Sequence, residues 1–131
     1  MNKRLVCILI LLCLLALGAT AEQVYIRLTL AEMERVTLAV QSRISEEDEV
    51  LATPQNIADV AYLSSFWARH RDGYEIFLSH TYAIELENKI SVLDTHLLQD
   101  DYLMTSTDLE GILASLDLIR DAVTPALHMI L

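Results

Sequence analysis

Residues that break helices are scarce in this chain, and this scarcity constrains its fold more than any other feature. After residue 21 there are two glycines and two prolines, Gly73, Gly111, Pro54 and Pro125, and they lie where helices should break. Between them, apolar residues recur at spacings of three and four, the period of one helix face. No segment has the alternating pattern of a strand. The sequence therefore predicts an all-α protein.

The first two helices can be placed from apolar spacing and from one start signal. The first helix is predicted from about residue 22 to 44. The second begins at Thr53-Pro54, because threonine caps a helix and proline suits the first helical position. The segment 71–73 supplies a glycine terminator or a kink. The predicted inner faces are Ile26, Leu30, Met33, Val36, Val40 and Ile44 in the first helix, and Ile57, Val60, Ala61, Ser64, Trp67 and Ala68 in the second.

The last two helices also carry clear signals. The third is predicted from about residue 74 to 98, and the fourth begins within 105–111, where Thr107 and Glu110 have the spacing of a capping box. Thr124-Pro125 should stop or kink the fourth helix. Because four amphipathic helices with short connections can close around one core, we predict an up-and-down bundle of about four helices. Their apolar stripes are Ala83, Leu86, Ile90, Leu93 and Leu97, followed by Leu109, Ile112, Leu113, Leu116, Ile119 and Val123.

The first 21 residues have the layout of an export signal or signal anchor. Lys3 and Arg4 precede an uncharged apolar run from residue 5 to 17. Small residues at 19 and 21 form a site where a signal peptidase could cleave the chain after Ala21. The run is short for a membrane span, which needs about 20 residues, but is borderline when 18–21 are counted. If it is kept, the first helix could continue directly out of the membrane.

The same segment predicts where the protein lies. Because Lys3 and Arg4 hold the N-terminus in the cytoplasm, residues 22–131 should form an extracytoplasmic helical bundle. It would stand on the outer face of the bacterial cytoplasmic membrane, or be secreted if the chain is cleaved after Ala21.

Composition excludes several functions for the exported part. Cys7 and Cys13 both lie in the apolar segment, so residues 22–131 can form no disulfide, thiolate metal site or cysteine nucleophile. The formal charge of the whole chain is −10, and residues 1–21 hold two cations and no anions, so residues 22–131 carry −12. Such a surface repels nucleic acid, which we do not expect as a partner.

The segment 77–97 raises the question of a ligand stripe, because His80, Glu87 and Asp94 lie seven residues apart. They share one edge of the apolar stripe, but neighbours in the series are about 10.5 Å apart along the helix axis, too far to share a metal ion. The spacings Glu-x-x-His and His-x-x-x-His do not occur. A metal site would need ligands from other helices, for example His70 or His128. We therefore expect the polar edge of a packed helix, with no metal or cofactor.

Trp67, beside the basic segment 68–71, is the second candidate. Trp67 lies on the apolar face of its helix, and tryptophan is usually well buried, so a core position is expected. Arg69 and Arg71 are a local cation cluster on an acidic domain and are the best candidates for a partner contact. No G-x-S-x-G, S-x-x-K or phosphate-binding glycine motif occurs, so we predict no catalytic residues and no enzymatic activity.

Several positions from residue 67 onward match a pattern found in small bacterial proteins. They are Trp67, His80, Leu86, Glu87, Ile90 and Leu93, followed by the acidic turn 99–101 and the ending 128–131. In these positions the chain resembles domain-of-unknown-function family 4363. Ala83, where a larger aliphatic is usual, and His128, where asparagine is usual, depart from the pattern. The resemblance implies a helical, membrane-associated protein without established activity, with a membrane protein of family 421 as a partner to test.

Two functions from different classes follow as hypotheses. The favoured one is a non-enzymatic, membrane-tethered or exported helical interaction or accessory protein, whose partner is a membrane protein or a second copy of the chain. The alternative is a cleaved, secreted helical module that binds a small ligand or metal, with His80, Glu87 and His96 at its site. The candidate interaction positions are Trp67, Arg69, Arg71, His80 and Glu87.

Overall fold

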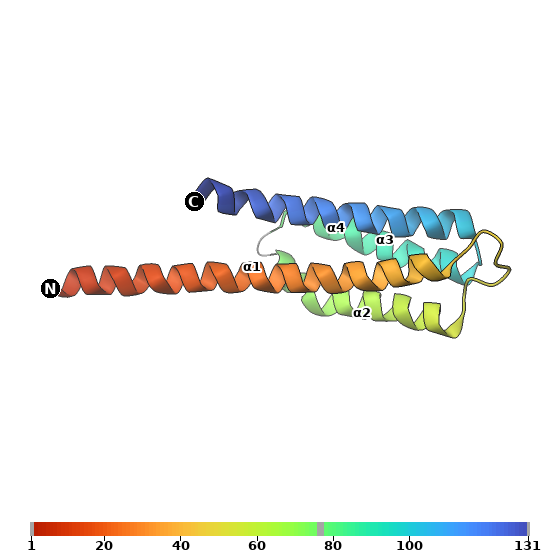
Figure 1. The fold of residues 1–131 in the computed structure, drawn as a ribbon, viewed down its shortest axis with the longest axis horizontal. Coiled ribbons are helices and arrows are strands. Elements are labelled where there is room, and N and C mark those ends of the chain that lie inside the picture. Colours follow the sequence, from red (N-terminus) through yellow and green to blue (C-terminus); the bar gives the residue numbers. More distant parts are fainter. Residues whose placement is uncertain (1, 76–77, 131) are drawn as a thin grey trace.

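The computed structural model describes residues 2–75 and 78–130, with side chains up to Val123, and confirms the all-α prediction. The helices are α1 (Lys3–Arg43), α2 (Pro54–Glu75), α3 (His80–Leu98) and α4 (Tyr102–Ile130), and there is no strand in the described ranges. Each helix runs opposite to the one before it, and α1 also packs against α4, which closes the ring (Figure 1). The chain is an up-and-down four-helix bundle.

The helix α1 is continuous over 41 residues and passes through two environments. It begins at Lys3, capped by the side chain of Asn2, and no break occurs near residue 22, so the N-terminal apolar segment and the first bundle helix are one element. The N-terminal end of α1 projects beyond the other helices (Figure 1), and the most apolar 18-residue window of α1 is wholly outside the core. From Ile26 onward, one face of α1 is buried in the bundle. This apolar half is compatible with a signal anchor or membrane span.

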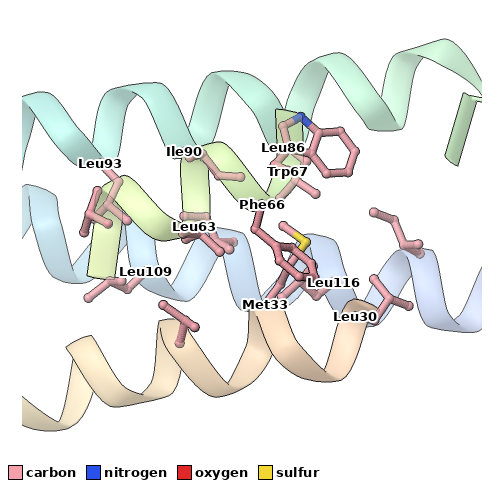
Figure 2. Close-up of a cluster of buried hydrophobic side chains, with 14 of the residues drawn as sticks. Leu30, Met33, Leu63, Phe66, Trp67, Leu86, Ile90, Leu93, Leu109 and Leu116 are labelled. Atoms are coloured by element: carbon pink, nitrogen blue, oxygen red, sulfur yellow. The ribbon is translucent and has the colours of Figure 1, made fainter. Parts of the chain in front are cut away.

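One apolar stripe from each helix forms the core, part of which Figure 2 shows. The stripe predicted for the third helix is confirmed at all five positions. In α4 the predicted Leu113 and Val123 are only partly buried, while the other four positions are fully buried. The core residues of these two helices are Ala83, Leu86, Ile90, Leu93 and Leu97 in α3, and Leu109, Ile112, Leu116 and Ile119 in α4.

The inner face predicted for the second helix is wrong in its orientation. Of the six predicted residues only Val60 and Trp67 are buried, and the others are exposed alanine, serine and isoleucine side chains. The helix is rotated so that larger side chains, Leu63, Phe66 and Tyr74, enter the core instead. Burying them removes more apolar area from water, which outweighs the regular spacing of the small residues. The small residues are thereby left on the outside of α2.

The limits of α4 also differ from the prediction. The helix begins at Tyr102, because the carboxylate of Asp101 accepts a hydrogen bond from the backbone of Met104 at 3.1 Å and so caps the first turn. Thr107 lies inside the helix and donates to the backbone of Leu103. Residues 124 and 125 do not end the helix, which continues to Ile130 alongside α1 (Figure 1).

Candidate functional site

A groove of about 530 Å³ lies on the outside of the bundle between α2 and α3. Its floor is formed by the buried residues Val60, Trp67 and Ile90. The α2 wall consists of four small, exposed residues, and the α3 wall carries a serine between two acids. These wall residues are Ala61, Ser64, Ser65 and Ala68 on α2, and Glu87, Ser91 and Asp94 on α3.

The groove exists because the α2 wall is built from very short side chains. Ala61, Ser64, Ser65 and Ala68 recur at helical spacing and extend over two turns, about 10.5 Å of the helix. Larger side chains at these positions would fill the space between the two helices. Three of these four positions were assigned by the sequence analysis to the buried face of the helix, and that assignment is wrong for them.

The other three seams between neighbouring helices are bridged by polar side chains. Between α2 and α3 the bridge is at one end of the groove, where Arg71 Nη1 lies 2.8 Å from Glu87 Oε2. Beyond this pair the seam stays open along the groove. The bridges on the other seams join Arg43 to Asp59 and Tyr62 to Glu32 (α1 to α2), Arg120 to Glu34 (α1 to α4), and Lys89 to Ser115 and His96 to Asp108 (α3 to α4).

Trp67 forms part of the groove floor and carries an unusual polar atom. Its side chain is 2% exposed, as expected for a core residue, yet the indole Nε1 has no hydrogen-bond partner among the described residues. Figure 2 shows this nitrogen on the side of the ring nearest α3. A buried N–H without an acceptor costs about 1–3 kcal/mol. The indole nitrogen is therefore a buried donor that the described part of the bundle does not satisfy.

The groove wall on α3 is acidic. Glu87 is held by Arg71, which also donates through Nε to Glu75 Oε1 at 3.0 Å. Asp94 is exposed and makes no hydrogen bond or ion pair within the described part of the chain. One carboxylate of the wall is thus neutralised and the other is available to a cation.

The predicted cation cluster is divided between two sides of α2. Arg71 points to α3 and is engaged by two carboxylates, so it is not a free partner contact. Arg69 is exposed, and its guanidinium carbon lies 5.8 Å from the ring centre of Phe66, on a different face. Of the five candidate positions, Trp67, Arg71 and Glu87 therefore come together at the groove, whereas Arg69 does not.

The histidines do not converge on one site. His80 is the first residue of α3; its side chain is 71% exposed and its Nδ1 lies 3.8 Å from Glu75 Oε1. No group of three or more His, Cys, Asp or Glu side chains that could hold a metal is present in the described residues. His128 lies outside the described side chains. The other two histidines bind partners elsewhere, His70 Nδ1 with Tyr25 Oη at 2.6 Å and His96 with Asp108.

Two polar contacts fix α2, and with it the groove wall, against α1. Tyr74 is fully buried and donates its hydroxyl to Thr29, and burial raises the pKa of Tyr74 to about 12. Tyr62 donates to Glu32 at 2.9 Å. Hydrogen bonds from Arg35 and then from Tyr62 lower the pKa of Glu32 to about 2. Both contacts hold α2 in the rotation that exposes the small residues.

Comparison with protein-family models, with curated proteins and with solved structures finds no match for this chain. The resemblance to family 4363 therefore stays a prediction. The site rests on the geometry of the bundle alone.

Proposed function

We propose that this protein is a non-enzymatic accessory protein, held at the outer face of the bacterial cytoplasmic membrane by its N-terminal apolar helix and binding a membrane-protein partner through its bundle. The continuity of α1 is the observation that carries the proposal. The same helix supplies an apolar segment outside the core and a full core stripe from Ile26 to Val40. A partner surface joined to the span by an unbroken helix has a defined height and orientation above the membrane, which suits an accessory subunit.

The groove between α2 and α3 supports the proposal that the bundle binds a partner. Its lining residues include serines and carboxylates, but no histidine or lysine that could activate a serine for nucleophilic attack. An exposed groove between two helices is a common place for a partner segment to bind.

Fractionation of the expressing bacterium, followed by intact-mass analysis, tests the tether. We expect a membrane-bound species that retains residues 1–21. A soluble species beginning at Glu22 would contradict the tether and favour the secreted binding module.

Site-specific photocrosslinking in the same cells tests the partner. A crosslinker at Ser64 in the groove should yield a discrete membrane-protein adduct. The same crosslinker at Leu118, an exposed position on α4, is the matched control and should not yield that adduct. Equal adducts from both positions, or none from either, would argue against a specific partner.

A further inference from the structure

We infer that the groove between α2 and α3 binds a helix of a partner protein whose contacting face combines small side chains with basic residues. The inference rests on the proposed interaction function and adds the chemistry of the partner. Two independent observations support it: the shape of the groove and the charge of its α3 wall.

The shape of the groove fits a helix. Its α2 wall is formed by Ala61, Ser64, Ser65 and Ala68, which repeat over two turns in one direction. Small side chains on both partners let two helix backbones approach closely, and a helix lies naturally along the trough between two others. An open groove that extends over about two turns of α2 is filled better by one face of a helix than by a compact small molecule.

The charge of the α3 wall selects a basic helix. Asp94 is exposed and unpaired in the described structure, and Glu87 lies seven residues earlier on the same face. A lysine or arginine of the partner helix can pair with Asp94, whereas Glu87 is already paired with Arg71. The formal charge of −12 on residues 22–131 attracts such a segment and disfavours an acidic one.

Trp67 lies in the floor of the groove and is one of its lining residues. Because Trp67 is the single tryptophan of the chain, its emission also reports directly on occupancy of the groove.

The test uses the full chain in nanodiscs of zwitterionic lipid, which do not attract a cationic peptide. The probe is an alanine-rich helical peptide of about 18 residues, with lysines seven residues apart and serines between them. The comparison peptide has glutamate in place of each lysine. We expect the lysine peptide to change the emission of Trp67 saturably, with an affinity that falls as salt is raised, and the glutamate peptide to have no effect.

Two substitutions in the groove wall identify the site. Ser64→Leu fills the trough and Asp94→Lys reverses its charge, and both positions are exposed, so the core is unchanged. Each should weaken binding of the lysine peptide by about tenfold or more. The matched controls on α4, Ala114→Leu and Glu110→Lys, are also exposed and should bind as the wild type does. Circular dichroism of every variant checks that the helices are retained.

Three results would overturn the inference. One is no response of Trp67 to the lysine peptide. The second is equal weakening by Asp94→Lys and Glu110→Lys, which would indicate attraction to the overall charge and not to the groove. The third is self-association of the protein that Ser64→Leu abolishes, which would make a second copy the occupant. None of these results concerns the membrane tether, which fractionation tests separately.

Discussion

The contact between Thr29 and Tyr74 predicts an asymmetry between two substitutions of similar size. The Tyr74 side chain is fully buried, and its hydroxyl donates to Thr29 Oγ1. Thr29 in turn donates to the backbone carbonyls of Tyr25 at 2.9 Å and Ile26 at 3.0 Å. In Tyr74→Phe the threonine keeps these acceptors, so the loss should be that of one hydrogen bond, about 1 kcal/mol.

Thr29→Val leaves the opposite partner unsatisfied. The buried hydroxyl of Tyr74 then retains only the carbonyl of Ile26 at 3.4 Å, a long contact. Its desolvation is no longer compensated, and we expect a loss of about 2 kcal/mol. The double variant removes both polar groups and should be no less stable than Thr29→Val alone. A second substitution that causes no further loss of stability indicates that the first one had left a buried polar group unsatisfied.

Urea unfolding in detergent measures these free energies. The emission of Trp67 is a local probe, because its ring centre lies 5.6 Å from that of Tyr74, and circular dichroism reports the helices. Thr107→Val is the matched control, since its exposed hydroxyl donates only to Leu103 within the same helix, and its effect should be within about 0.5 kcal/mol. A smaller loss for Thr29→Val than for Tyr74→Phe would refute the reasoning.

The same pair predicts a pH dependence. Burial raises the pKa of Tyr74 from 10.0 to about 12, so the folded protein holds this proton more tightly than the unfolded chain does. The stabilisation is fully present below pH 10 and is lost as the pH rises towards 12. Tyr74→Phe should lack this loss, and unfolding between pH 9 and about 11.5 checks it. Equal pH profiles of the two proteins would contradict the assignment.

Three further predictions concern α1, α2 and the core. Gly73→Ala should raise the free energy of unfolding by about 0.5 kcal/mol, because alanine has the higher helix propensity. The new Cβ would lie 3.1 Å from the hydroxyl of the half-exposed Tyr25, whose side chain can shift to make room. A lower free energy of unfolding in urea would show that Tyr25 cannot shift. Because the pKa of Glu32 is lowered from 4.5 to about 2, the free energy of unfolding should fall as the pH drops from 4.5 towards 2. Glu32→Gln should lack this part of the pH dependence when both proteins are unfolded over the same pH range. Leu93→Ala should lower the free energy of unfolding, measured by thermal unfolding, by about 3 kcal/mol, because Leu93 is fully buried. Leu103→Ala, at an exposed position, should lower it by less than about 0.5 kcal/mol.

Local signals in the sequence were sufficient for the number and type of the helices but not for all of their limits, since α2 continues to Glu75 and α3 begins at His80 and not near Tyr74. The apolar stripe of α3 and the start of α2 at Pro54 were predicted correctly, since spacing and capping depend on near neighbours. The start of α4 was wrong because both Asp101 and Thr107 can cap a helix, and a sequence does not show which one does. The rotation of α2 was wrong because two faces of that helix, one small and one bulky, have helical spacing.

The candidate groove was not predicted from the sequence, although two of its lining residues were among the candidate positions. Trp67 and Glu87 were selected individually, and Ala61 and Ser64 were assigned to the buried face of the second helix. Nothing in the sequence indicated that α2 and α3 would bring them together around a groove. Whether Arg71 is free or paired likewise depends on Glu87, which is distant in sequence. The position of the groove and the pairing of Arg71 both depend on contacts between helices that are distant in sequence.

By itself, the sequence determined an all-α bundle, a terminal apolar segment without internal breaks, and an acidic remainder without cysteine, because periodicity, composition and charge are properties of the chain. Only the tertiary structure decided which face of α2 is buried and therefore where the groove lies. The physical reason is that burial is a competition: bulky Leu63, Phe66 and Tyr74 gain more from leaving water than alanine and serine do, and the outcome depends on the core that the other three helices supply.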